Sequence, residues 1–128
     1  MKLHELPFAK IIILSDSIAE VIINEHVEMT LAMVNQYHEF LLSHLVSPFS
    51  LLINKVNAYT YDFDAQVNLA TLKEINAMAV VSYTRSTKIS TEYLTSLVPR
   101  KVVWKLKIFT NRDEALNWLK LEQGSLKH

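Results

Sequence analysis

The residues best able to do chemistry gather in a short polar stretch of the sequence, residues 57–64. Asp62 and Asp64 place two carboxylates two positions apart, a spacing that could hold a divalent cation or divide acid and base duties. The stretch lacks a third acidic ligand and the glycine of a calcium-binding loop, so we predict no metal site. The alternative, which we favour, is that one carboxylate caps a following helix.

His38 is the next candidate, either as a ligand or as a proton carrier. It falls on an otherwise apolar helical stripe, so a hydrogen-bonded histidine at the edge of the core is the alternative interpretation. His26, His38 and His44 are twelve and six residues apart, which matches no helical metal-ligand spacing. We therefore predict no metal, no cofactor and no catalytic residue.

A second polar group could bind an anion at the start of a predicted helix. Free backbone N–H groups and positive charge favour anions at such a position. An ordinary solvated helix entry explains the same residues without a ligand. The residues of this predicted anion site are Arg85, Ser86, Thr87 and Lys88.

Basic residues near the C-terminal third raise the question of nucleic-acid binding. Val102, Trp104, Leu106 and Ile108 alternate with lysines, the pattern of a strand with one wet face. The alternation turns Trp104 away from the cations, so no aromatic stacks beside them. An exposed strand face is the favoured interpretation, and no nucleic-acid partner is predicted. The cations concerned are Arg100, Lys101, Lys105 and Lys107.

Composition narrows the function classes further. The 128 residues contain no cysteine, which removes disulfides, zinc–thiolate sites and thiol nucleophiles from consideration. One glycine and three prolines leave no glycine-rich phosphate loop. Formal charge is zero overall, but residues 1–64 carry three Lys and eight acids, a net of −5, and the second half carries +5. Two halves of opposite sign could attract each other, or could simply be two different solvated surfaces.

The cellular location is predicted from two kinds of apolar segment, signal peptides and membrane spans. The start of the chain has no apolar segment typical of a signal peptide, and no apolar run approaches membrane-spanning length. We therefore expect a cytoplasmic protein without a membrane span.

Predicted strands and helices alternate along the chain and position these residues. Residues 9–14 and 18–23 are rich in β-branched residues and are joined by a turn, which predicts an antiparallel hairpin with a further strand over 3–8. Asn24 is the predicted N-cap of a long helix that ends near Pro48. Its predicted inner face comprises Val27, Leu31, Val34, His38, Leu41 and Leu45, widened by Met29, Met33, Tyr37 and Phe40.

The second half of the chain continues the alternation. Residues 49–53 and 77–83 are short apolar runs typical of buried strands. Helices are predicted from Asp62 or Asp64 to about Ile75, over 89–97, and over 114–121 behind the cap at 110–113. The predicted fold class is α/β, a mixed sheet with an N-terminal antiparallel hairpin and helices packed against it. We expect one domain over 1–122 and a frayed tail over 123–128.

The segment KIFTNRDEALNWL, residues 107–119, resembles the C-terminal signature of the SpoIIAA-like proteins. In that family a strand ending in Phe leads to a polar cap, acids and then Ala-x-x-Trp-Leu, here Ala115, Trp118 and Leu119. The resemblance implies a STAS-like α/β fold and a non-enzymatic domain of a largely uncharacterised family, often dimeric and bacterial. STAS proteins proper are phosphorylated on a Ser or Thr beyond the central strand, usually after an Asp. Here Thr60 is the only such hydroxyl, and Asp62 follows it.

These observations leave three hypotheses. The leading one is a protein-interaction or regulatory domain, whose expected partner is a second copy in a homodimer or an unknown protein. Its contact surface is the loop carrying Tyr59, Thr60, Tyr61, Asp62 and Asp64, where aromatics including Phe63 lie beside acids. Alternatively, these rings simply cover the end of the sheet. The second hypothesis is a small-molecule or lipid-binding domain with a cavity between sheet and helices, and the third is an enzyme using Asp62, Asp64 and His38.

Overall fold

A six-stranded mixed sheet forms the centre of the protein. The computed structural model describes residues 2–69, 71–96 and 105–127. The strand order is β1-β2-β3-β5-β7-β8, in which β1, β2 and β3 are antiparallel and β3, β5, β7 and β8 are parallel. The predicted mixed α/β sheet with an N-terminal antiparallel hairpin is thus confirmed. The strands of this sheet are β1 (Lys2–Leu6), β2 (Ala9–Ser15), β3 (Ile18–Ile23), β5 (Phe49–Lys55), β7 (Ile75–Ser82) and β8 (Leu106–Phe109).

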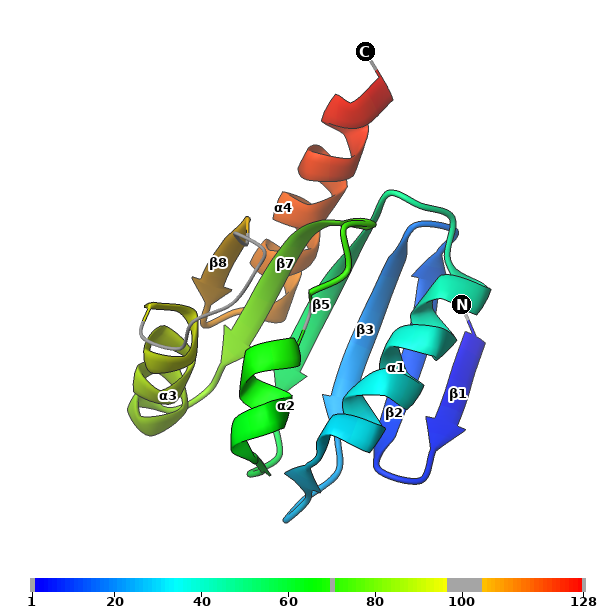
Figure 1. Cartoon of the computed structure of the whole chain (residues 1–128). Coiled ribbons are helices and arrows are strands. Elements are labelled where there is room, and N and C mark those ends of the chain that lie inside the picture. The colour runs from blue at the N-terminus through cyan, green and yellow to red at the C-terminus, as the bar shows by residue number, and fades with distance from the viewer. Residues whose placement is uncertain (1, 70, 97–104, 128) are drawn as a thin grey trace.

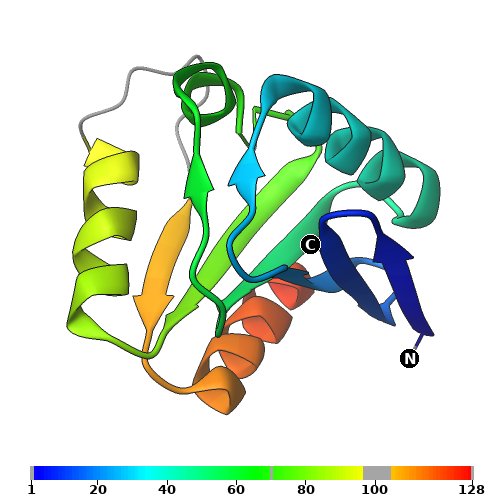
Figure 2. The ribbon, with the colours of Figure 1, turned by 90° about the horizontal axis from the view of Figure 1, so that it is seen from below.

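Helices cover both faces of this sheet (Figure 1). In the view of Figure 2, α1 (Leu31–His44) and α2 (Phe63–Asn68) lie on one face and α4 (Arg112–Gly124) lies on the other. The third helix, α3 (Arg85–Ser96), lies beside the β8 edge. A 3-10 helix, Ser125–Lys127, follows α4. No helix in the described ranges is long and apolar enough to cross a membrane.

The strand β5 is buried because both layers of helices pack against it. Phe49 and Leu51 belong to the core under α1, whereas Leu52 belongs to the core under α4. A strand covered on both faces reads as a continuous apolar run, which is why the sequence predicts it well. The structure confirms the predicted strand and extends it by two residues, to Lys55.

The start of the first long helix was predicted wrongly. The helix begins at Leu31, and Thr30 caps it by accepting a hydrogen bond from the Met33 N–H at 3.4 Å. Asn24 instead lies in a turn, where His26 has a positive φ of 65°. The chain then forms a short strand, β4 (Glu28–Met29), which pairs in parallel with β6 (Thr60–Tyr61). This pairing gives the backbone N–H and C=O groups of β4 the hydrogen bonds that a helix over 25–30 would otherwise give them.

Two other predicted boundaries change as well. Helix α2 ends at Asn68, not near Ile75, and Ile75 and Asn76 belong to β7. Helix α3 begins at Arg85, four residues before the apolar face that predicts it. Part of the predicted strand with alternating lysines, including Arg100, Lys101 and Trp104, lies outside the described residues.

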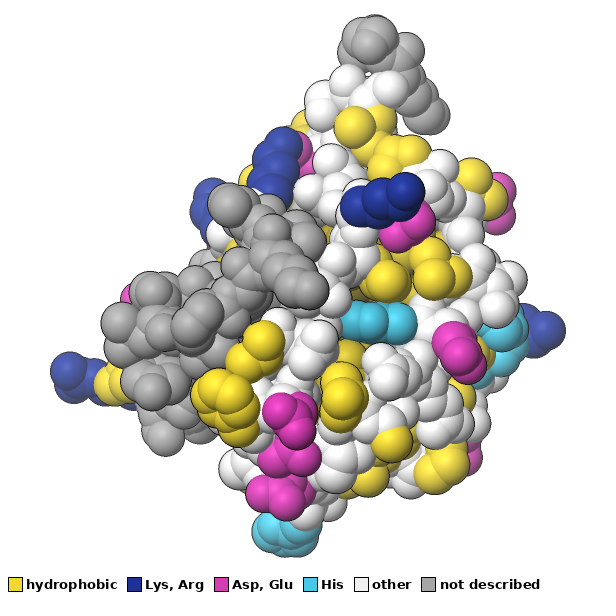
Figure 3. All heavy atoms as spheres, viewed as in Figure 1, with side chains coloured by type: hydrophobic (Ala, Val, Ile, Leu, Met, Phe, Trp, Pro, Cys, Tyr) yellow, Lys and Arg dark blue, Asp and Glu magenta, His cyan; other side chains and the backbone are white. Residues whose placement is uncertain are grey.

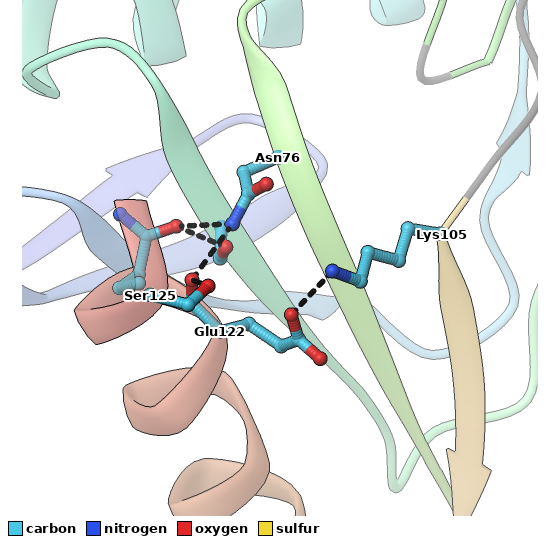
Figure 4. Close-up of polar contacts among 6 residues, drawn as sticks. Asn76, Lys105, Glu122 and Ser125 are labelled. Atoms are coloured by element: carbon cyan, nitrogen blue, oxygen red, sulfur yellow. Dashed lines mark hydrogen bonds and ion pairs between the residues drawn. The ribbon is translucent and has the colours of Figure 1, made fainter. Parts of the chain in front are cut away.

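The end of α4 is held against the sheet by polar contacts (Figure 4). Asn76 of β7 donates hydrogen bonds to Gln123 Oε1 and to the Glu122 carbonyl oxygen, at 3.1 and 3.4 Å. Lys105 forms an ion pair with Glu122, and Ser125 donates to the Glu122 carbonyl oxygen. The helix therefore continues three residues beyond the predicted end at 121, into the segment 123–128 that was predicted to be frayed.

A buried ion pair joins α4 to the centre of the sheet. Arg112 donates from Nε and Nη2 to both carboxylate oxygens of Glu20, at 2.6 to 3.1 Å. Asn54 Nδ2 donates to the same carboxylate at 2.8 Å. Glu20 is only 3% exposed, so this network fixes the position of α4 on β3 and β5. It lies on the face of the sheet opposite α1.

Candidate functional site

The predicted loop is fixed by the small ladder between β4 and β6. The Thr60 N–H donates to the Val27 carbonyl oxygen and the Asp62 N–H to that of Met29, both at 2.9 Å. The His26 N–H donates to the Ala58 carbonyl oxygen at 2.7 Å. Because side chains alternate along an extended segment, Tyr59 and Tyr61 project to the same side.

Both tyrosine rings turn inward and pack against the core under α1. The Tyr61 hydroxyl donates to the Tyr59 hydroxyl at 3.2 Å, and the rings meet edge to face with centroids 5.4 Å apart. Burial raises the pKa of Tyr61 to about 12 and also raises the pKa of Tyr37 and of Tyr59 well above the ordinary value. All three phenols therefore stay neutral at physiological pH. The inward position of Tyr59 and Tyr61 agrees with the alternative interpretation, in which these rings cover the end of the sheet.

An apolar pocket lies where these rings meet the sheet. Its volume is about 40 Å³, room for on the order of three water molecules at about 10–15 Å³ each. Strands β3, β5, β7 and β8 supply most of its wall, and α1, α3 and the loop supply the rest. The described lining residues are Val21, Ile23, Met29, Tyr37, Ile53, Lys55, Tyr59, Tyr61, Leu69, Met78, Val80, Thr91 and Leu106.

Lys55 is the one charged residue among the described lining residues. Its Nζ donates to Thr91 Oγ1 at 2.8 Å and lies 5.8 Å from the centre of the Tyr59 ring. Thr91, on α3, in turn donates to the Thr87 carbonyl oxygen at 2.9 Å. Burial lowers the pKa of Lys55 to about 8, because the apolar surroundings disfavour the charged amine. No ion pair to Lys55 is found within the described part of the chain.

A second, wider depression of about 450 Å³ lies between α4 and the loops after β2 and α1. It is open to solvent, and its described lining contains one charged residue, Lys120. Small-molecule sites are usually enclosed and apolar, with a few polar groups that converge on the ligand. The pocket at Tyr59, Tyr61 and Lys55 fits this description better, so we take it as the candidate site.

The remaining loop residues point to solvent or serve the backbone. Phe63 is 70% exposed, and Thr60 and Asp64 are also exposed. On the face viewed in Figure 3, acidic side chains gather near α2 beside separate exposed hydrophobic ones. That this surface contacts a protein partner stays a prediction.

Asp62 caps helix α2, in agreement with the favoured interpretation of its carboxylate. Its side chain accepts a hydrogen bond from the Ala65 N–H at 2.8 Å. We therefore expect Asp62→Ala to lower the free energy of unfolding by about 1 kcal/mol, the usual effect of losing an N-cap. Urea denaturation would measure it. Asp64→Ala is the matched control, because this exposed carboxylate caps nothing in the described structure; equal losses in the two variants would contradict the capping role.

His38 lies apart from the pocket lining, on α1. It is 8% exposed, its ring lies 5.7 Å from that of Tyr37, and burial lowers its pKa to about 4. It is therefore neutral at physiological pH. No group of three or more metal-binding side chains occurs in the described ranges. Nothing in the described geometry joins His38, Asp62 and Asp64 into one site.

The predicted anion site lies at the start of α3. Arg85 and Lys88 are exposed, and the Thr87 N–H is occupied by Thr84 Oγ1 at 3.0 Å. The Lys88 N–H donates to the Thr84 carbonyl oxygen at 3.1 Å. The Ser86 side chain lies outside what the structure describes. Anion binding at these residues stays a prediction.

Sequence reasoning missed the two residues that give the pocket its polarity, Lys55 and Thr91. Lys55 continues the alternation of β5 and therefore shares a face with Ile53. A strand extended to Lys55 would have placed a cation on this inner face. Thr91 carries no comparable signal, because its role depends on where α3 packs.

The fold has a counterpart among solved structures. A crystal structure of an uncharacterised protein from the DUF3478 family with a SpoIIAA-like fold, from Shewanella loihica PV-4, matches 92% of this chain and 90% of its own. The TM-score is 0.55 and the sequence identity is 16%, so the likeness concerns the fold. No family model matches the sequence, and no curated protein matches it significantly. The chain thus has a SpoIIAA-like fold, and the comparisons indicate no enzyme family.

Proposed function

We propose that this chain is a binding domain for a small, slender amphipathic molecule that enters the pocket lined by Tyr59, Tyr61 and Lys55. The observation that carries the proposal is the composition of the lining, which is apolar except for a few polar groups that converge on one space. Apolar surface supplies affinity in such pockets, and the few polar groups fix the orientation of the ligand. This proposal corresponds to the second hypothesis drawn from the sequence.

The size of the pocket limits the ligand. A volume of about 40 Å³ admits only a few heavy atoms, so both a ring system and a longer chain require the walls to move. Tyr59, Tyr61 and Leu69 are only partly buried, and small rotations of such side chains widen a pocket at low cost. A flexible aliphatic chain is the shape that requires least movement.

We infer that the domain binds its ligand without transforming it. The described lining contains no Asp, Glu, His or Ser. In its one Lys–Thr contact the Lys55 amine donates to Thr91 Oγ1, and the Thr91 hydroxyl donates to the Thr87 carbonyl oxygen, so Lys55 does not act as a base toward that hydroxyl in this arrangement. A protein-contact role is the second candidate, favoured by the exposed Phe63. Capture of a partner by the wild type but not by Phe63→Ser would support it, and sedimentation velocity would test the predicted homodimer.

Ile53→Phe is expected to close the pocket. Ile53 is partly buried and lines the space, so the larger ring fills existing volume and changes the free energy of unfolding by about 1 kcal/mol or less. Octanoate, 1-octanol and octylamine share one chain and serve as probes. At ten times its Kd, a bound probe raises the free energy of unfolding of the wild type by about 1.4 kcal/mol. Thermal unfolding with each probe measures this.

The matched control is Ile22→Phe. It makes the same substitution on β3, on the face of the sheet that points away from the pocket. A probe that stabilises the wild type and Ile22→Phe but not Ile53→Phe supports the proposal. Stabilisation of all three proteins alike, or of none by any probe, overturns it. Native mass spectrometry of the wild type would identify a ligand that co-purifies.

A further inference from the structure

The amine of Lys55 is held in an apolar pocket with very few polar partners. Among the described residues, its Nζ has one hydrogen-bond acceptor, Thr91 Oγ1. The two ion pairs of the described structure are Lys105–Glu122 and Arg112–Glu20, so no carboxylate balances Lys55. An ammonium group can make three hydrogen bonds, and two of them are left for another acceptor. Lys55 is partly withdrawn from water without a counter-ion, which disfavours its charged form, so an anion beside it would be favourable.

The phenol of Tyr59 lines the same pocket as this amine. The Tyr59 hydroxyl accepts a hydrogen bond from Tyr61, and its own hydrogen has no acceptor in the described part of the chain. The Tyr59 ring is also the aromatic contact of Lys55, at 5.8 Å. The ammonium group therefore has donors available for a group in the pocket that can only accept hydrogen bonds. An ionised carboxylate has that property.

From this arrangement we propose that the ligand is a monoanionic organic acid, whose carboxylate pairs with Lys55 while its apolar chain lies against Ile53, Met78 and Val80. This inference rests on the proposed function and specifies the chemical class of its ligand. One charge is inferred because Lys55 is the single cation in the described lining, whereas a phosphate dianion would need a second one. The apolar remainder of the lining requires that the rest of the molecule be uncharged.

Isothermal titration calorimetry with the three probes tests the inference. Octanoate should bind the wild type at least tenfold more tightly than 1-octanol, and octylamine should bind most weakly, because its charge opposes that of Lys55. Lys55→Met should bring octanoate and 1-octanol to within about twofold of each other. Lys55→Arg should keep the preference for octanoate, because its guanidinium stays charged.

The pH dependence gives an independent readout that needs no variant. Because the pKa of Lys55 is about 8, the Kd of octanoate should rise about tenfold for each pH unit above 8, while that of 1-octanol stays constant. The other titratable groups of the described lining are Tyr37, Tyr59 and Tyr61, whose raised pKa values keep them neutral in this range. His38, on α1 outside the lining, is neutral throughout this pH range. Lys55→Arg should abolish the rise.

The possible outcomes separate the two proposals. If 1-octanol binds the wild type as tightly as octanoate, the inference is overturned and the proposed binding function stands. A preference for octanoate that survives in Lys55→Met, or a Kd that is flat to pH 10, also overturns the inference. If no probe binds, both proposals fall.

Discussion

Arg112→Met is expected to lower the free energy of unfolding by about 3 kcal/mol at pH 7. The variant leaves the carboxylate of Glu20 buried with Asn54 as its remaining donor. Removing one partner of a buried ion pair costs about 3–5 kcal/mol, and the lower end applies because the Arg112 side chain is 36% exposed. Urea denaturation followed by circular dichroism would measure the loss.

The loss should depend on pH. Burial by itself raises the pKa of Glu20, but hydrogen bonds from Arg112 and Asn54 and the charge of Arg112 outweigh it, so the pKa lies below 4.5. In the wild type this contribution is present above pH 4.5 and is lost as the pH falls through the lower folded-state pKa. In Arg112→Met, burial prevails and the pKa of Glu20 rises. The difference between the two proteins should therefore shrink as the pH falls through the raised pKa of Glu20 in the variant, and should be smallest below the lowered pKa of Glu20 in the wild type.

A double variant provides the control for this ion pair. Glu20→Met combined with Arg112→Met removes both charges, and an apolar pair of similar volume is often as stable as the ion pair it replaces. We expect the double variant to be more stable than Arg112→Met alone at pH 7. If the single and double variants lose the same stability, the network contributes through packing and not through charge.

Tyr59→Ala combined with Tyr61→Ala is expected to cost about 4 kcal/mol. Both rings pack against the core and against each other, and truncating a buried aromatic side chain typically costs about 3–5 kcal/mol. Each ring is only partly buried, so each contributes less than this full value. Chemical denaturation would measure the loss, and the sum of the single variants should differ from the double variant because the rings contact each other.

Phe63→Ala is the matched control in the same loop. Its ring is 70% exposed, so its removal should change the free energy of unfolding by less than about 0.5 kcal/mol. Equal losses for Phe63 and for the tyrosines would contradict the inward position of Tyr59 and Tyr61. The double tyrosine variant is unsuitable for locating a contact surface. It loses core packing, so a loss of partner capture in that variant could come from the altered fold.

The sheet could be predicted from the sequence because its strands carry strong local signals. The β-branched residues of β2 and β3 and the short turn between them specify a hairpin. The apolar run of β5 signals burial on both faces, and Asn111 caps α4 next to the predicted position. In each case the residues that decide the structure are neighbours in sequence.

The errors occur where distant segments decide the structure. Asn24 and the acids after it have the local chemistry of a helix start, but β4 pairs with β6 and moves the start to Thr30. A cap at Asp62 or Asp64 was predicted and Asp62 is the one observed, whereas the length of α2 depends on where the chain must enter β7. Local propensity is a weak prior, and tertiary pairing overrides it at both sites.

The direction of the loop side chains could not be predicted either. An aromatic cluster next to acids is compatible with a contact surface and with a cover over the sheet. The choice depends on β4, because its pairing with β6 sets which side chains turn inward. The contact between Lys55 and Thr91 depends on a distant segment in a similar way, because α3, far along the chain, brings Thr91 to the amine.

The most direct test of the account is a methyl-labelled NMR titration of the wild type with octanoate. Binding in the pocket should produce saturable shifts for the methyl signals of Ile53, Val80 and Met78, which line it. The signals of Ile12 and Ile22, away from it, should stay in place. Shifts confined to Ile12 and Ile22, or no saturable shift at Ile53, Val80 and Met78, would contradict the account.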